Sequence, residues 1–274
     1  MISSIVVNNS FFLLFNSIYV SLLLFLYEFI SKKGANASEA LDFTQNYGAT
    51  YWGDQPIVAA PAYIGAIVFM LFVLAMFIDK RKIKYAFLVG AVFTLMLSWG
   101  KNFAFLTNIF IDFVPFYDKF RAVSSIQGIV ELCLPLLAIM GLQSFFKADK
   151  SEKIDALKKT AIVSLGSIGL LFIFKFLFDF TGPIDIRLEQ MFAQMGDPTF
   201  GNEFLDALRA DRQKMYASDV LRSGVLIIIT LGILLLYTKE KLSQFITVVL
   251  VGIFMVGDLV FVDKNYVDTS GFVS

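Results

Sequence analysis

The chain lacks histidine altogether and contains a single cysteine among its 274 residues. Without histidine it cannot form a Ser-His-Asp triad, and it lacks the most frequent general base and metal ligand of proteins. The one thiol, Cys133, cannot form a disulfide within the chain or build a cysteine zinc site. We therefore expect no metal and no cofactor, and any chemistry must use carboxylates, Lys, Arg, Tyr or amides.

Charge is also scarce, because only 17% of the residues are charged and the 23 basic residues balance the 23 acidic ones. Soluble domains carry about 25% charged residues, and a neutral chain gives no reason to expect a nucleic-acid partner. Hydrophobic residues instead make up 57% of the chain, Phe alone occurs 31 times, and the mean hydropathy is +0.73. These values indicate an integral membrane protein, with membrane lipid as its surroundings.

Long apolar runs alternate with short polar stretches. About 20 apolar residues suffice to cross a bilayer as a helix. We therefore predict an all-α fold, a polytopic transmembrane helical bundle of six to seven spans, in a multi-span membrane domain over residues 34–274. The status of the N-terminal apolar segment, residues 1–33, stays open because no basic residue precedes it. The candidate spans are 2–27, 61–78, 85–100, 122–146, 160–178, 223–238 and 242–262.

The basic turns predict the orientation. The connections 79–84, 147–159 and 239–241 contain four, five and two Lys or Arg residues, and they alternate so that all three fall on one side. The positive-inside rule assigns that side to the cytoplasm. The C-terminus and the three remaining loops are then expected outside, with short amphipathic helices in those loops. The outward loops are 34–60, 100–122 and 179–222.

Two helical patterns occur within the last of these loops. Leu188, Met191, Phe192 and Met195 follow the i, i+3, i+4, i+7 spacing of an amphipathic helix. We expect this apolar face to lie flat on the bilayer. Residues 203–220 contain no Gly or Pro, so a second helix is expected to run on into the span that follows.

The stretch 97–131 mixes charges and aromatic rings more densely than any other part of the chain. Aromatic rings with polar surroundings favour the headgroup level of a bilayer, so we predict a loop folded against the membrane surface. Within it, Lys101, Lys119 and Arg121 could together hold a phosphate or pyrophosphate, Arg through its planar fork. The alternative is ordinary snorkelling of each cation toward water. Asp118 is a candidate substrate contact, or else a partner of the neighbouring cations.

Further candidates precede this stretch or lie at its end. Trp52 and Asp54 precede a span, and a carboxylate held beside rings could act as a general base or position a sugar hydroxyl; the alternative is an Asp that stabilises a turn. Gln127 and Glu131 lie on one stripe of an otherwise apolar helix with Ser124. A carboxylate in a span usually faces a bundle interior or cavity, so Glu131 is either a catalytic group or a hydrogen-bonding group between helices.

Four segments in order resemble a family of bacterial membrane proteins, the YfhO-like proteins. They are Tyr51-Trp52-Gly53-Asp54-Gln55-Pro56, Tyr63-Ile64-Gly65-Ala66, Leu97-Ser98-Trp99-Gly100-Lys101-Asn102 and Pro115-Phe116-Tyr117-Asp118-Lys119-Phe120-Arg121-Ala122-Val123-Ser124. The resemblance runs from about residue 40 to the end of the chain, and residues 2–30 do not share it.

The YfhO-like family is related to GT-C glycosyltransferases, so the resemblance implies a transferase that takes a sugar from a polyprenyl-phosphate donor on the extracytoplasmic face of the bacterial plasma membrane. Lys101 and Arg121 would hold the donor phosphate, Glu131 would orient Arg121 or Gln127, and Asp54 would contact the sugar or acceptor. Family members are longer, with a catalytic acid expected upstream of Met1 and an outward domain beyond Ser274. The chain is therefore expected to be a middle piece of a larger protein.

Two other interpretations stay open. One is a lipid or polysaccharide transporter or flippase, with Glu131, Lys175 and Asp258 lining a path. Transporter sites usually lie at the bilayer midplane between repeats, whereas Lys175 and Asp258 are near the ends of their spans and no repeat is visible. The other is a catalytically inert fragment.

Overall fold

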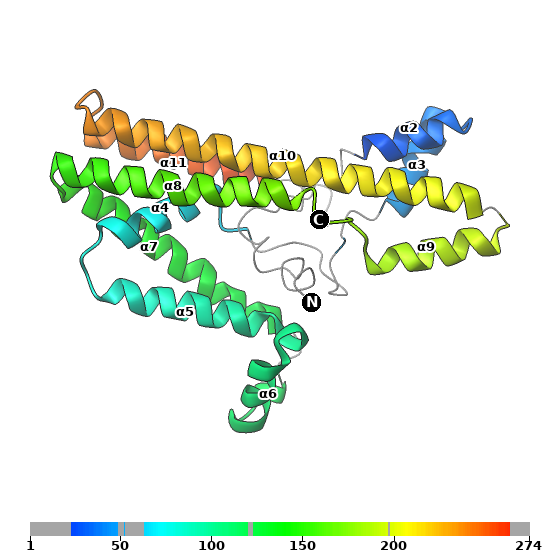
Figure 1. Cartoon of the computed structure of the whole chain (residues 1–274), viewed down its shortest axis with the longest axis horizontal. Coiled ribbons are helices and arrows are strands. Elements are labelled where there is room, and N and C mark those ends of the chain that lie inside the picture. Colours follow the sequence, from blue (N-terminus) through cyan, green and yellow to red (C-terminus); the bar gives the residue numbers. More distant parts are fainter. Residues whose placement is uncertain (1–22, 49–51, 53–62, 120–122, 197, 264–274) are drawn as a thin grey trace, which may run out of the picture.

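The computed structural model describes residues 23–48, 52, 63–119, 123–196 and 198–263. Every regular element within these ranges is a helix (Figure 1). The α-helices are α2 (Leu24–Lys32), α3 (Ala37–Tyr47), α4 (Ala66–Ile78), α5 (Ile83–Ser98), α6 (Ala104–Phe113), α7 (Gln127–Lys147), α8 (Lys150–Phe174), α9 (Pro183–Gln194), α10 (Pro198–Thr238) and α11 (Gln244–Asp263). The short 3₁₀ turns are η3 (Gly100–Phe103), η4 (Tyr117–Lys119) and η5 (Val123–Ile126).

Helix α4 forms the centre of the larger of two hydrophobic cores, and nine of its 13 residues are buried. A helix that is apolar on all sides is stable only when other elements surround it, and α7, α8, α10 and α11 all contact α4. The crossing with α7 is tight, because a Cβ at Gly141 would lie only 2.8 Å from the backbone nitrogen of Ala75 and the backbone oxygen of Leu71. We call this assembly of α4, α5, α7, α8, α11 and the second half of α10 the bundle.

Four helices in the described residues are long and apolar enough to cross a membrane: α7, α8, α10 and α11. This is compatible with an integral membrane protein and does not confirm the expected six to seven spans. Helices α4 and α5 have 13 and 16 residues, which corresponds to about 20 and 24 Å of helix. Both are apolar, and both stand in the bundle beside α7.

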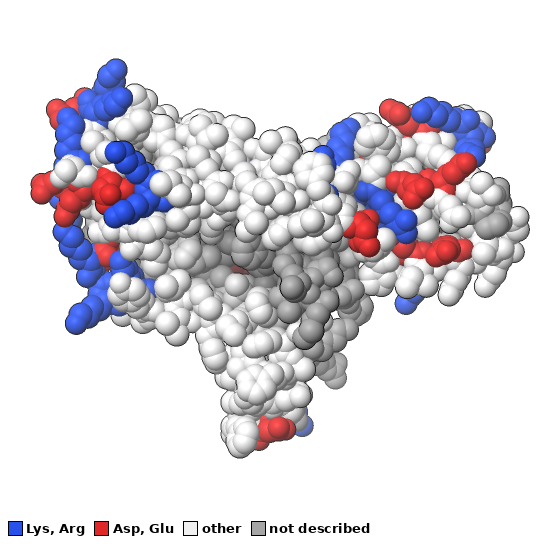
Figure 2. Space-filling model, viewed as in Figure 1, with Lys and Arg blue, Asp and Glu red and all other residues white. Residues whose placement is uncertain are grey.

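The three basic turns lie together at one end of the bundle. The ammonium of Lys80 is 2.7 Å from the carboxylate of Glu152, and that of Lys150 is 3.1 Å from Glu240, so each turn contacts the next. Figure 2 shows these charges gathered at the left end of the molecule, followed by a band almost free of charge. The three turns therefore lie at the same end of the bundle, as expected for loops on one side of a membrane. We call this the basic end.

A second, smaller core forms what we call the outer lobe, at the other end of α10 (Figure 1). It contains α2, α3, α9 and the first half of α10, and its centre includes Leu26, Leu188, Phe192 and Phe204. The expectation that the apolar face of α9 lies on the bilayer is wrong for Leu188 and Phe192, because this core buries them. In addition, α2 belongs to the outer lobe rather than to a span; residues 1–22 lie outside the described residues.

Helix α10 connects the two cores without a break over 41 residues, or about 60 Å. The predicted continuity between residues 203–220 and the span is thereby confirmed. The carboxylate of Asp211 on α10 accepts hydrogen bonds from the backbone N–H groups of Phe25 and Leu26, at 3.0 and 2.8 Å. These N–H groups belong to the first turn of α2, which lacks a capping side chain of its own, so Asp211 supplies the acceptor that such a turn requires.

Candidate functional site

The predicted loop at the membrane surface is built by η3, α6 and η4, which we call the arm (residues 100–119). It starts where α5 ends, away from the basic turns, and Figure 1 shows α6 projecting from the side of the bundle. Three of its large aromatic side chains are open, with exposed fractions of 74% for Phe105, 79% for Phe113 and 76% for Phe116. Exposed apolar surface on a projecting element marks a contact with lipid or a partner.

The predicted cations lie on or beside the arm. Lys119 ends η4 and is exposed. Lys101 lies in η3 and Asp118 in η4, but their side chains are outside the described part of the structure, and Arg121 lies outside the described residues entirely. The shared anion pocket therefore stays a prediction. At the root of the arm, Thr107 donates a hydrogen bond to the carbonyl oxygen of Gly100 at 2.8 Å, which fixes α6 to η3.

Gln127 and Glu131 have different surroundings in the structure. Gln127 is buried at the start of α7, and its side-chain amide donates a hydrogen bond to the hydroxyl oxygen of Ser98 at 3.3 Å. This contact joins α7 to the end of α5, where the arm begins. Glu131 is exposed on α7 and does not face the bundle interior as expected. The described structure thus gives Gln127 a positioning contact and leaves the role of Glu131 a prediction.

Trp52 packs against the segment that follows α8, and Asp54 lies outside the described residues. The ring of Trp52 contacts Phe178 and Phe180 with centroids 5.8 and 4.9 Å away. The backbone passes so close to Gly182 that a Cβ there would lie 2.9 Å from the Cα of Trp52. Trp52 is therefore a packing anchor for the chain that leads into Asp54.

A buried polar network that the sequence did not reveal joins α4, α10 and α11. Asp258 of α11 is 5% exposed and accepts hydrogen bonds from the hydroxyl of Tyr63, at 2.8 and 3.0 Å, and from the backbone N–H of Ala66, at 3.1 Å. Gly65 precedes α4 with no capping side chain. Asp258 therefore provides the negative charge that the N-terminus of α4 favours, although it is near the end of its span.

Arg222 of α10 completes this network. Its Nη2 lies 3.9 Å from Asp258 and 3.8 Å from Asp219, and donates a hydrogen bond to the hydroxyl oxygen of Tyr63 at 3.3 Å. The guanidinium also stacks over the rings of Tyr63 and Phe261 at 5.5 Å. A planar guanidinium is suited to combine a carboxylate with aromatic faces. The network fixes three helices to one another.

A second buried network lies where the outer lobe meets the bundle. Arg212 of α10 has a completely buried side chain, and its Nη1 contacts both carboxylate oxygens of Asp185, at 2.9 and 3.1 Å, and the carbonyl oxygen of Phe180, at 2.8 Å. Arg209 reaches the same carboxylate at 3.3 Å from a side chain that is 34% exposed. The i, i+3 spacing of the two arginines on α10 is the one sequence signal that points to this site.

The three residues suggested for a transport path lie in different environments. Glu131 is exposed, the ammonium of Lys175 lies over the rings of Phe172 and Phe176 at 5.9 and 5.8 Å, and Asp258 is enclosed as described above. This arrangement does not favour a path shared by the three. Within the described residues, no group of three or more His, Cys, Asp or Glu side chains is placed to hold a metal ion.

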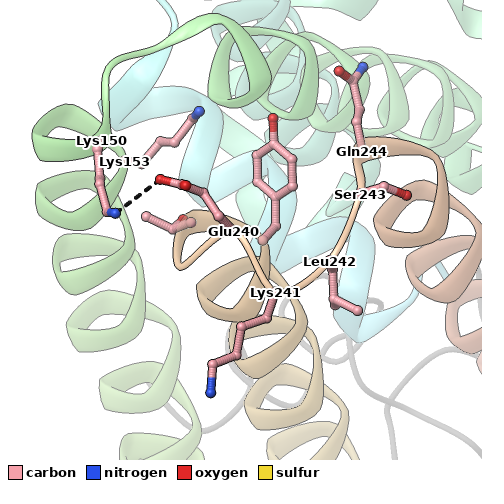
Figure 3. A pocket seen from close by; sticks show the side chains of 9 residues that line it. Lys150, Lys153, Glu240, Lys241, Leu242, Ser243 and Gln244 are labelled. Carbon is pink, nitrogen blue, oxygen red and sulfur yellow. Dashed lines mark hydrogen bonds and ion pairs between the residues drawn. The ribbon is translucent and has the colours of Figure 1, made fainter.

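An open pocket of about 460 Å³ lies at the basic end (Figure 3). It is formed by the first turns of α8 and by the turn between α10 and α11. Its lining is Lys150, Lys153, Tyr237, Thr238, Glu240, Lys241, Leu242, Ser243 and Gln244. Nearby, Asp79 accepts hydrogen bonds from Arg81 and Ser144. Burial acts to raise the pKa of Asp79, but these hydrogen bonds outweigh it and hold the pKa below its usual value.

No family model, no curated protein and no solved structure matches this chain.

Proposed function

We propose that the chain is a six-span protein of the bacterial plasma membrane, with the basic end in the cytoplasm and the arm at the extracytoplasmic surface. The placement is supported by the three basic turns, which contact one another, because the positive-inside rule places clustered Lys and Arg in the cytoplasm. Helices α4 and α5 would act as the two additional spans. Helix α5 runs from a basic turn to the start of the arm. If α5 is a span, the basic turn and the arm lie at opposite surfaces of the membrane.

Within this orientation, we propose that the chain is the membrane part of a GT-C-like glycosyltransferase that binds a polyprenyl-phosphate-linked sugar. The observation that carries the proposal is the arm itself, where Phe105, Phe113 and Phe116 are at least 74% exposed and Lys119 follows directly. A polyprenyl donor has an isoprenoid tail and an anionic phosphate. Exposed rings at headgroup depth suit the tail, and a neighbouring cation suits the phosphate.

Roles for the remaining residues follow from position and from the resemblance. Lys101 and Arg121 would join Lys119 on the phosphate, since the three bracket the arm in sequence. The contact of Gln127 with Ser98 holds the start of α7, which follows Arg121 in sequence, against the end of α5. Asp54 would contact the sugar or acceptor from the loop between the two anchors Trp52 and Tyr63.

The test is binding of a polyprenyl-phosphate sugar to the full chain in nanodiscs. Lys101→Ala, Lys119→Ala and Arg121→Ala should each weaken binding by at least about tenfold, because a hydrogen bond to a charged group contributes about 1.5–3 kcal/mol. Lys158→Ala, an exposed cation near the basic end, is the matched control and should bind like wild type. Equal binding by all five proteins would refute a donor site on the arm.

A further inference from the structure

The pocket at the basic end carries an excess of positive charge. Its lining contains three ammonium groups, on Lys150, Lys153 and Lys241, against the single carboxylate of Glu240, which leaves two positive charges. Lys150 and Glu240 form an ion pair at 3.1 Å across the mouth, and Figure 3 shows this pair on one side of the cavity. Of the other two ammonium groups, that of Lys153 lies beside Tyr237, whereas that of Lys241 points away from it toward the opposite rim (Figure 3).

The neutral groups of the pocket fit a phosphate as well. The ammonium of Lys153 lies 5.0 Å from the ring centroid of Tyr237, which positions it on the wall formed by α10. Ser243 and Gln244 contribute a hydroxyl and an amide from the opposite wall (Figure 3). Phosphate oxygens accept hydrogen bonds from ammonium, hydroxyl and amide donors alike. The cavity of about 460 Å³ has room for a headgroup-sized anion.

The surroundings distinguish a lipid from a soluble phosphate. The helices that leave the pocket present open apolar side chains, with exposed fractions of 77% for Phe245, 46% for Ile246 and 41% for Leu236. Each of these residues is next to a lining residue or one further along its helix. Polar contacts for a headgroup are thus continuous with an apolar surface for acyl chains, and a free anion would use only the first.

We propose that this pocket binds the phosphate-bearing headgroup of an anionic phospholipid, with the acyl chains lying along α10 and α11. Lys153 contacts the phosphate beside Tyr237, Lys241 adds a second positive charge at the far rim of the pocket (Figure 3), and the apolar residues of the two helices contact the chains. Basic pockets between spans at the cytoplasmic surface are suited to anionic headgroups. The bound lipid would link the start of α8 to the turn between α10 and α11.

The experiment measures which lipids the full chain retains. The protein, in micelles with equal amounts of phosphatidylglycerol and phosphatidylcholine, is examined by native mass spectrometry. The pocket variant is Lys153→Ala/Lys241→Ala. The control variant is Lys158→Ala/Lys239→Ala, which also removes one cation from α8 and one from the same turn, neither of which lines the pocket.

Wild type and the control variant should retain phosphatidylglycerol preferentially. The pocket variant should lose about fivefold of that preference per lysine removed, or about 25-fold in all. Glu240→Gln, which removes the competing carboxylate, should increase the preference and tests the pocket even if the double variant does not fold. An unchanged preference in the pocket variant, an equal loss in the control, or full displacement of the lipid by millimolar inorganic phosphate would each overturn the assignment.

Discussion

Replacing Arg212 by Met should lower the free energy of unfolding, because Arg212 is a buried contact at the junction of the outer lobe and the bundle. The side chain of Arg212 is completely buried, and it contacts both oxygens of Asp185 and the carbonyl oxygen of Phe180. Methionine replaces the aliphatic part of the side chain without its charge or its hydrogen-bond donors. The variant therefore leaves the carboxylate of Asp185, whose side chain is 5% exposed, with Arg209 as its remaining basic contact.

The magnitude follows from the burial of the pair. Removing one partner of a buried ion pair costs about 3–5 kcal/mol, because the other charge stays in a medium of low dielectric constant. Arg209→Met removes an ion pair to the same carboxylate, but the arginine side chain there is 34% exposed. Solvent screening limits such pairs to at most about 1 kcal/mol. The two variants should therefore differ in the free energy of unfolding by at least about 2 kcal/mol.

Tryptophan fluorescence reports this junction directly. The chain has two tryptophans, and the ring of Trp52 contacts Phe180, the residue whose carbonyl oxygen Arg212 contacts. In a Trp99→Phe background the emission comes from Trp52 alone. Unfolding by added sodium dodecyl sulfate in mild-detergent micelles then gives the free energy for wild type and for each arginine variant.

Two outcomes would refute the reasoning. One is an unfolding free energy for Arg212→Met within 1 kcal/mol of wild type, and the other is an equal loss for Arg209→Met. The double variant Asp185→Leu/Arg212→Met supplies a further check. Replacing both members of a buried pair by apolar residues is often neutral, so the double variant should be more stable than Arg212→Met alone.

Three other predictions concern the bundle. Asp258→Asn should lower the unfolding free energy by about 1.5–3 kcal/mol, because hydrogen bonds to a charged acceptor are lost. Asp263→Asn, at an exposed position of the same helix, should leave the unfolding free energy unchanged. The titration with sodium dodecyl sulfate measures both variants, and equal effects would contradict the buried network. Gly141→Ala should cost about 1–3 kcal/mol by overpacking, whereas Gly128→Ala on the same helix, with nothing within 4 Å of its Cβ, should be neutral or stabilising; thermal melts followed by circular dichroism decide, and similar melting temperatures would contradict the close approach. Folding lowers the pKa of Asp79, so its contribution to stability is fully present above the unfolded pKa of about 3.9 and is lost as the pH falls through the lower folded pKa. Asp79→Asn should therefore be less stable than wild type at pH 7 and lose less stability on acidification below about pH 4. Parallel profiles of stability against pH for the two proteins would rule this out.

Much of the bundle could be predicted because a span is encoded locally. The apolar runs of α7, α8 and α11, and the charges between them, lie in continuous stretches of sequence. The continuity of α10 followed from the absence of Gly and Pro over residues 203–220. None of these inferences requires information on which helices contact one another.

The partners of buried polar groups could not be predicted, since they are distant in sequence. Asp258 and Tyr63 are 195 positions apart, and a carboxylate near the end of a span has the same local sequence whether it reaches water or caps another helix. The face of α9 that contains Leu188 and Phe192 raised the same difficulty. An amphipathic pattern predicts an apolar contact but does not say whether lipid or another helix makes it.

The unbroken course of α10 couples the rotational setting of the outer lobe to that of the bundle. A residue inserted between Arg212 and Arg222 would turn the lobe by about 100° around the helix axis and move it by 1.5 Å. It would withdraw either Arg212 from the carbonyl oxygen of Phe180 or Arg222 from Asp258. An insertion of seven residues, close to two full turns, would nearly restore the original angle. The continuous helix thus fixes the rotation of the outer lobe relative to the bundle.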